Sequence, residues 1–358
     1  MLLALATPAV ASPSGSASPS PSASGSGLAG RATFGVGPAT LGSIDQRGYF
    51  SYVMGVGGIY NDQAAVINYG PAPLTLSVFA ADLGNGDGGA ITVGLQSQTT
   101  TDAGSWVALP AKNLVVTVPA RGKVGPGRVI VPFRITVPDN AAPGDHGAAI
   151  VAVLSTLGKN PKGENVRLDQ RVASRIYLRV NGPLHPGLRI ENLSVSYRQS
   201  WNPLHAGTAI VRYTVHNVGN VRLSGRQAVS VTGLFGTSSK VVTPADLQLL
   251  FPGASAPVSV QVGGVFPALF ERSKVTVTPS LFTDQRPMPV PTATAARSFT
   301  AVPWLLIAAV LLLALLVLLV WWLRRRATRR PPRGGRHGRG GPVLTPSPRP
   351  RNPETIAS

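Results

Sequence analysis

The stretch RVIVPFRITVP, Arg128–Pro138, decides the fold class. Its apolar side chains occupy every second position, and polar ones such as Arg128, Arg134 and Thr136 stand between them. The apolar positions are Val129, Val131, Phe133, Ile135 and Val137. Because successive side chains of a β-strand point to opposite faces, this pattern predicts a strand with one buried face and one solvated face.

The same alternation recurs along the chain, and turn-forming residues separate the runs. The alternating apolar sets are Leu74, Leu76 and Val78; Ala209, Val211, Tyr213 and Val215; Val258, Val260 and Val262; and Val275 and Val277. The turns between them include Asn85–Gly88, Pro138–Asn140, Pro143–Asp145 and Asn217–Asn220. No stretch before residue 302 keeps a helical period. Short strands at this spacing predict an all-β fold of immunoglobulin-like antiparallel β-sandwiches.

A boundary is expected where strand-breaking residues cluster. Asn181-Gly182-Pro183 ends one alternating run, and a new run begins at Leu188. The sequence therefore predicts two β-sandwich domains, at 31–182 and 188–300. We expect PMPVPTATAARSFTAVP, residues 287–303, to form a short stalk.

A single transmembrane helix is predicted at 302–323. Trp304–Leu323 holds twenty uncharged residues, which at ~1.5 Å per residue span about 30 Å, the thickness of a bilayer core. Arg324, Arg325 and Arg326 follow directly, whereas the other side has Arg297 nearby. By the positive-inside rule the tail is cytoplasmic and the body is extracytoplasmic.

The N-terminal residues are expected to serve export. Residues 1–11, MLLALATPAVA, combine a short apolar run with a small-x-small site, as in the end of a signal peptide without its basic start. We expect the true initiator to lie upstream. The alternative is an apolar disordered N-terminus. Residues 12–30 are rich in Ser, Pro and Gly and predict a linker.

The net charge of +19 divides between the two sides of the predicted helix. Residues 324–358 hold ten Arg and one Glu, about +9, and form a basic tail that we expect to be disordered and to contact anionic lipid. Nucleic-acid binding is the weaker explanation of this tail and is not expected. The chain has no cysteine, which excludes disulfides, thiolate zinc sites and a cysteine nucleophile.

An enzyme is not expected, nor is a cofactor. No G-x-S-x-G or H-E-x-x-H motif occurs, and the histidines are scattered among turns, the predicted domain junction, a strand and the tail. Asp145-His146 in the PGDHGA turn is an acid/base pair by composition alone. A solvated turn is the favoured interpretation.

Two further features have a functional and a structural interpretation. Asp82, Asn85 and Asp87 offer oxygen ligands for calcium, but their spacing differs from an EF-hand loop, and a glycine-rich hairpin turn is favoured, so no metal is expected. Trp106 is either a core residue or a ring on which a sugar stacks.

The segment QRVASRIYLRV, Gln170–Val180, predicts a basic strand face. Alternation places Arg171, Arg175, Arg179 and Tyr177 on one face, with the arginines roughly 13 Å apart. Guanidinium groups at this spacing suit a repeating anionic polymer. The alternative is a solvated face whose charges discourage edge pairing.

Several segments resemble the WxL-interacting cell-surface protein family. For the peptidoglycan-binding domain these are Tyr60–Asp82, GSWVALP around Trp106, Val131–Val153 and Arg171–Gly182; for the second module they are Asn202–Gly225, LLFPG and GGVFP. The resemblance implies an immunoglobulin-like, non-enzymatic wall protein with a C-terminal membrane anchor. It also implies peptidoglycan as the partner of the first domain and a WxL or host-surface protein as the partner of the second.

Together these observations predict a single-pass surface protein that binds wall glycan, a surface protein, or both. Two other functions stay open. One is a structural spacer without a ligand, and the other is a sensor subunit of an envelope complex.

Overall fold

The computed structural model describes residues 32–328 except 161, 203–204, 234–238, 268–269, 283–286 and 303. The expected signal-peptide remnant (1–11), the linker (12–30) and the tail from 329 onward lie outside the described residues. The described residues up to Ser200, together with His205–Val302, form one compact unit. The C-terminal helix belongs to a second unit. The number of separate domains in the first unit stays a prediction, so we refer to residues 32–182 as the first half and to 188–299 as the second half.

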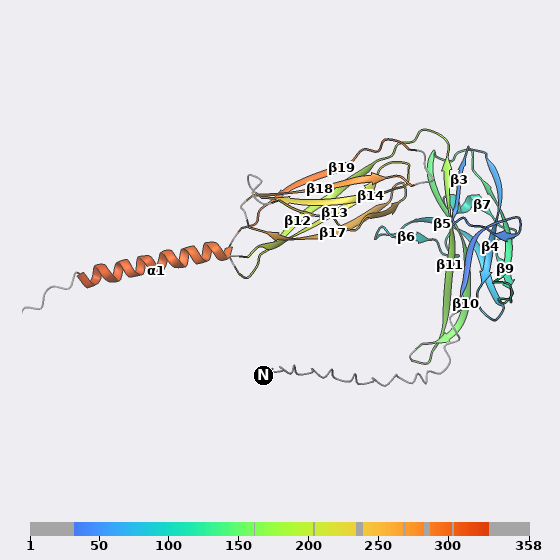
Figure 1. Ribbon diagram of the computed structural model, residues 1–358, viewed down its shortest axis with the longest axis horizontal. Coiled ribbons are helices and arrows are strands. Elements are labelled where there is room, and N and C mark those ends of the chain that lie inside the picture. Colours follow the sequence, from blue (N-terminus) through green and yellow to red (C-terminus); the bar gives the residue numbers. More distant parts are fainter. Residues whose placement is uncertain are drawn as a thin grey trace, which may run out of the picture. The chain divides into compact units, whose positions relative to one another are not determined.

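The first half consists of two facing β-sheets (Figure 1). Its elements are β1 (Phe34–Thr40), β2 (Ser43–Ile44), β3 (Phe50–Met54), β4 (Ile59–Asn68), β5 (Leu74–Asn85), β6 (Ile91–Val93), the 3-10 helix η1 (Ala103–Trp106), β7 (Val107–Ala108), β8 (Leu114–Val118), β9 (Gly127–Thr136), β10 (Gly144–Lys159) and β11 (Asn165–Val180). Within the described residues, one sheet has the order β2-β1-β4-β9-β7. The other has the order β3-β11-β10-β5-β6, and β8 also pairs with β5. All of these pairs are antiparallel except β11 with β3.

The core of the first half lies between its two sheets, and the predicted alternation is confirmed there. Val131, Phe133 and Ile135 of β9 are at most 3% exposed, while Arg128 and Arg134 of the same strand are exposed. Leu76 and Val78 of β5 are fully buried in the same core. Burial of such side chains contributes about 1.5–3 kcal/mol each, which fixes the register of every strand that lines the core.

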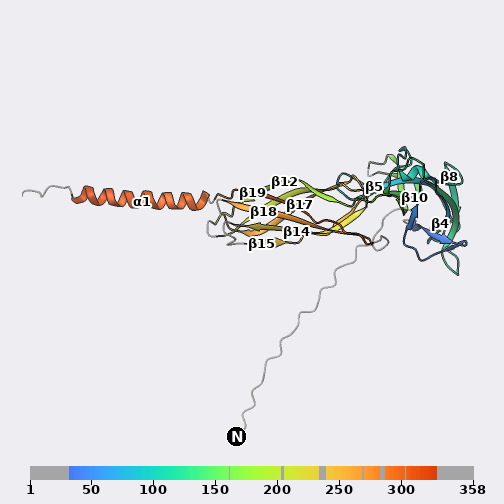
Figure 2. The same ribbon diagram turned by 90° about the horizontal axis from the view of Figure 1, so that it is seen from above.

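The second half repeats this construction with its own core (Figure 2). Its strands are β12 (Leu188–Arg198), β13 (Gly207–Asn217), β14 (Leu223–Thr232), β15 (Ser239–Val242), β16 (Leu247–Leu250), β17 (Ser255–Val265), β18 (Glu271–Ser280) and β19 (Ala293–Phe299). The described strands form one sheet in the order β12-β13-β17 and another in the order β15-β14-β18-β19, with β16 beside β14. The predicted apolar faces of β13 and β18 are buried.

In both halves, the turn that follows one core strand is stabilised by a buried asparagine two residues before a glycine. Asn68, at the end of β4, is fully buried; its amide donates to the Ala72 carbonyl at 2.7 Å and accepts from the Gly70 N–H at 2.8 Å. Asn217 makes the equivalent bonds at the end of β13. Each side chain also reaches a carbonyl of a more distant segment. A single amide therefore satisfies backbone groups at each corner that burial would otherwise leave without water.

The predicted stalk at 287–303 is wrong for its central part. Ala293–Phe299 forms β19, which pairs with β18 from Glu271↔Phe299 to Val277↔Ala293. Composition favoured a linker, but the small residues fit the edge of a sheet, where pairing with one neighbour is sufficient.

Helix α1 (Trp304–Thr328) is confirmed as a candidate membrane span. Trp304–Arg326 has a mean hydropathy of 3.0, and none of the apolar window is buried within the protein. Such a surface requires an apolar solvent. At its C-terminal end the guanidinium carbons of Arg325 and Arg326 lie 4.3 and 5.0 Å from the rings of Trp321 and Trp322.

Candidate binding surface

The outer face of the sheet that contains β5, β10 and β11 carries two of the predicted ligand-binding arginines. Arg171 lies opposite Val153 in the register, and Arg175 lies opposite Ala149; both arginines are exposed. Beside them, on β5 and β10, lies an apolar strip whose members are at most 6% exposed. Its members are Phe79, Ala81, Ala149, Val151 and Val153. The face therefore combines exposed cationic groups with apolar side chains that are almost wholly buried.

Hollows adjoin this strip. One, of about 400 Å³, is lined by Arg171, Ala173 and Gly94, among others. A second, of about 310 Å³, shares Gly94 and continues along the 95–100 segment to Thr100. We call the two hollows together the Arg171 groove. It is open to solvent and is shaped for an extended ligand more than for a small enclosed one.

Tyr177 and Arg179, which the sequence placed on the same solvated face, are not free to bind a polymer. Tyr177 is 5% exposed; its ring packs edge-on against Tyr49 at 5.2 Å between centroids and lies 6.1 Å from the Phe251 ring. The Arg179 side chain is 11% exposed and forms an ion pair with Asp145. Alternation predicted the face correctly, but residues of the second half cover its C-terminal end.

Asp145 is the centre of a buried ionic cluster that joins the two halves. Its carboxylate is fully buried and accepts two bonds from Arg179, both at 2.7 Å. It also accepts the backbone N–H of Arg222 at 2.8 Å. The Arg222 guanidinium carbon lies 4.2 Å from the centroid of Tyr177. We call these four residues the junction cluster, and it explains why Arg179 is a structural residue.

The side-chain amide of Asn85 forms a second set of hydrogen bonds between the halves. Its nitrogen donates to the Leu249 carbonyl at 2.7 Å, and its oxygen accepts the Phe251 N–H at 2.8 Å. Asp82 accepts the N–H groups of Thr101 and Gly104, each at 2.7 Å, and so holds the turn that enters η1. Asn85 and Asp82 are thus committed to backbone groups. The weak calcium interpretation of these residues together with exposed Asp87 is not supported, and the described residues contain no cluster of three His, Asp or Glu side chains suited to a metal.

Trp106 and His146 lie against each other at one end of the first core. Trp106 is half-buried, and its ring centroid is 4.7 Å from that of His146. His146 contacts the Asp102 carboxylate through Nδ1 at 2.7 Å and the Ala142 carbonyl through Nε2 at 2.9 Å. Burial lowers the pKa of His146, but these two acceptors raise it more, so the net shift is upward. Since Asp145 points to the opposite face of β10, Asp145 and His146 do not form an acid/base pair.

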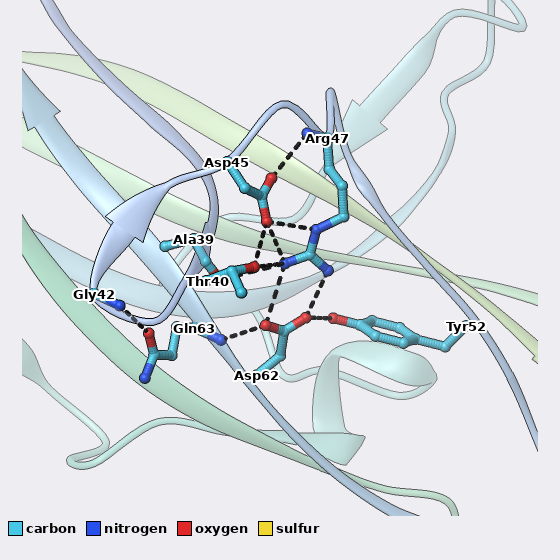
Figure 3. A network of polar contacts seen from close by, with 8 residues as sticks. All are labelled: Ala39, Thr40, Gly42, Asp45, Arg47, Tyr52, Asp62 and Gln63. Carbon is cyan, nitrogen blue, oxygen red and sulfur yellow. Dashed lines mark hydrogen bonds and ion pairs between the residues drawn. The ribbon is translucent and has the colours of Figure 1, made fainter.

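A polar network at Arg47 was not singled out from the sequence (Figure 3). Arg47 donates to Asp45 at 2.7 Å and to Asp62 at 2.8 Å. Tyr52 donates its hydroxyl to Asp62 at 2.5 Å, and Thr40 donates to Asp45 at 2.8 Å. Asp62 lies on β4 of one sheet and Tyr52 on β3 of the other, so the network closes one end of the sandwich. These partners lie in separate turns and strands, and only the fold reveals their proximity.

The Arg47 network predicts acid sensitivity. Burial raises the pKa of Asp62, but hydrogen bonds from Arg47 and Tyr52 lower it by a larger amount, so the net shift of the pKa is downward. A carboxyl whose pKa is lowered in the folded state stabilises the fold above its unfolded pKa of about 4, and this contribution is lost as the pH falls through the folded value. We expect Asp62→Asn to lower the urea midpoint at pH 7 and to differ less from the parent near pH 3. Asp87→Asn, at an exposed turn, is the control. An equal deficit of Asp62→Asn at both pH values would contradict this.

A shallow groove of about 630 Å³ lies on the outer face of the other sheet of the first half. Asn61, Gln63 and Arg134 line it, and Arg134 donates to Asn61 at 3.1 Å. Its lining also includes the apolar Leu109, Pro110 and Phe133. Arg134 is the one arginine of this lining, whereas Arg171 has the exposed Arg175 on the same face of its strand. We therefore treat it as the second candidate surface.

Comparison with known proteins gives no family. No family model matches the chain, and no curated protein matches it. Among solved structures, the chain is similar to the class 5 fimbriae chaperone CfaA, with 11% identity over 76% of this chain and 100% of that chain and a TM-score of 0.33. It is also similar to the CsuC–CsuE chaperone–tip adhesion subunit complex of Acinetobacter baumannii, with 13% identity over 69% of this chain and 93% of that chain and a TM-score of 0.35. TM-scores this low describe only a partial overlap of β architecture.

Proposed function

We propose that the chain is a non-enzymatic, single-pass membrane protein that binds an anionic cell-wall polymer through the Arg171 groove. The observation that carries the proposal is the pair of exposed arginines, Arg171 and Arg175. Val93, Val151 and Ala173 line the hollow beside Arg171 and give it an apolar floor. Guanidinium groups bind phosphates and carboxylates in a bidentate way, and an apolar floor suits the C–H faces of sugar rings. A repeating anionic glycan presents both features along its length.

The proposed topology places the β body outside the cytoplasm. Its support is the asymmetry of charge about α1, where Arg324, Arg325 and Arg326 follow the apolar window. We further propose that the two halves are two immunoglobulin-like domains and that the chain is related to the WxL-interacting proteins. Of the segments that carry this resemblance, Tyr60–Asp82 falls on β4 and β5, and Arg171–Gly182 falls on β11.

Sedimentation of the detergent-solubilised full chain with isolated walls tests the binding proposal. At low salt, Arg171→Gln with Arg175→Gln should reduce retention about tenfold or more, because a charge-assisted hydrogen bond contributes about 1.5–3 kcal/mol and ~1.4 kcal/mol is a factor of ten. Retention of the parent should fall as salt screens the exposed charges. Walls stripped of their anionic polymer should retain less of the parent.

The matched control is Arg212→Gln with Arg226→Gln, which removes the same charge from exposed positions of the second half. This variant should sediment like the parent. If the Arg171/Arg175 variant sediments equally well, the groove is not the binding site. A parent without saturable retention would instead favour a spacer, and a phenotype that depends on the cytoplasmic tail would favour a sensor subunit.

A further inference from the structure

Strand register defines the end of the second half from which the chain leaves for α1. Glu271 at the start of β18 pairs with Phe299 at the end of β19. Gly207 at the start of β13 pairs with Val265 at the end of β17, and Thr232 at the end of β14 pairs with both Arg272 and Ser239. These pairs place the start of β13, the ends of β14 and β17, and the starts of β15 and β18 at the same end as Phe299. We call it the exit end.

The exit end exposes large aromatic side chains. Phe266 and Phe270, on either side of the connection between β17 and β18, are 56% and 62% exposed. Aromatic rings of this size bury most of their surface in ordinary folds. Two of them, exposed beside each other in the sequence at one end of a sandwich, mark a contact surface.

The charges of the exit end are cationic. Arg198, Lys240 and Arg272 are exposed in the described strand ends. Glu271 is the acidic residue of the described part of this end, and it is 2% exposed. Aromatic rings beside exposed cations are the combination that partitions into a lipid headgroup region, and the cations favour anionic lipid.

The connection to α1 is too short to hold the exit end far from the bilayer. β19 ends at Phe299, and α1 begins at Trp304. An extended chain covers at most about 3.6 Å per residue, so these five steps span roughly 18 Å. The headgroup region itself occupies about 5–7 Å on each side of the hydrocarbon core. With α1 in the bilayer, the exit end lies within reach of the headgroups.

We infer that the exit end is a lipid-binding surface in which Phe266 and Phe270 enter the headgroup region and Arg198, Lys240 and Arg272 contact lipid phosphates. This inference requires α1 to span the bilayer but does not depend on wall binding or on which side the body lies.

Depth-dependent quenching in single-copy nanodiscs tests this surface. The parent chain has no cysteine, so Phe266→Cys, Phe270→Cys and Val218→Cys each give one site for an environment-sensitive fluorophore. Val218 follows the end of β13, opposite the exit end, and is 44% exposed. Phosphatidylcholine with a headgroup nitroxide should quench the probes at 266 and 270 several-fold more than the probe at 218.

Adding phosphatidylglycerol should increase quenching at 266, and Arg198→Gln with Arg272→Gln should remove that increase. Equal quenching at 266, 270 and 218 would overturn the inference. The same measurement is made in discs that hold two copies. Strong quenching in those discs alone would also overturn the inference, because the aromatic surface would then be a contact between copies. Failure of the wall-sedimentation test leaves these expectations unchanged.

Discussion

Asp145→Ala should lower the free energy of unfolding of the β body by about 3–5 kcal/mol, the usual cost of removing one partner of a buried ion pair. The Asp145 carboxylate is fully buried, and Arg179 beside it is 11% exposed. Without the carboxylate, the Arg179 guanidinium loses both of its 2.7 Å bonds while it stays largely away from water. The backbone N–H of Arg222 loses its acceptor as well.

Urea unfolding of the detergent-solubilised chain measures this effect. Asp169→Ala is the control, because Asp169 also pairs with an arginine, Arg167, but both side chains are largely exposed. The control should not shift the midpoint measurably, since exposed ion pairs contribute little. An Asp145→Ala midpoint equal to that of the parent would show that the junction cluster does not stabilise the body. Hydrogen exchange at residues 220–222 should rise in the same variant, because this segment is anchored to Asp145.

Asn217→Ala should cost about 2–4 kcal/mol, because each buried backbone group that loses its partner costs about 1–3 kcal/mol. The amide of Asn217 donates to the carbonyls of Val221 at 2.8 Å and Leu250 at 3.0 Å and accepts from Gly219 at 3.1 Å. Alanine supplies none of these bonds and leaves the turn after β13 without an anchor. The loss is measured by the same urea titration.

Asn68→Ala should give a similar loss, since Asn68 holds the equivalent corner of the first half with the same geometry. Asn113→Ala, at an exposed position, is the control for the loss of an amide and should be nearly neutral. If Asn217→Ala behaves like Asn113→Ala, the corner amides are not needed for the fold. Similar losses at Asn68 and Asn217 would support two halves built to one plan.

Sequence pattern predicted the buried faces well because alternation is a local property of a strand. The faces of β9 and β13 follow from their own residues, and burial confirms them. Pattern did not predict what covers a face. Tyr177 and Arg179 occupy the same face of β11 as Arg171 and Arg175, but the second half covers only the former pair.

The polar groups were harder to predict because their partners are distant in the sequence. Asp82 and Asn85 stand in a glycine-rich turn that is typical of a solvated hairpin, but they hold backbone groups of a later loop and of the second half. The residues Asn68 and Asn217 carried a usable signal, namely an Asn-x-Gly step at the end of an alternating run. That signal predicts a turn, and only the fold shows that each amide is buried.

Labelling of single cysteines in intact cells tests most directly the claim that the β body is displayed outside a membrane spanned by α1. Val124 is fully exposed on the first half, so Val124→Cys offers an accessible thiol in a chain that otherwise has none. A cysteine placed after Ser358 reports on the tail. We expect a membrane-impermeant maleimide to label Val124→Cys in wall-stripped intact cells and to label the C-terminal cysteine only after lysis. Labelling of the C-terminal cysteine in intact cells, with Val124→Cys protected, would contradict the account.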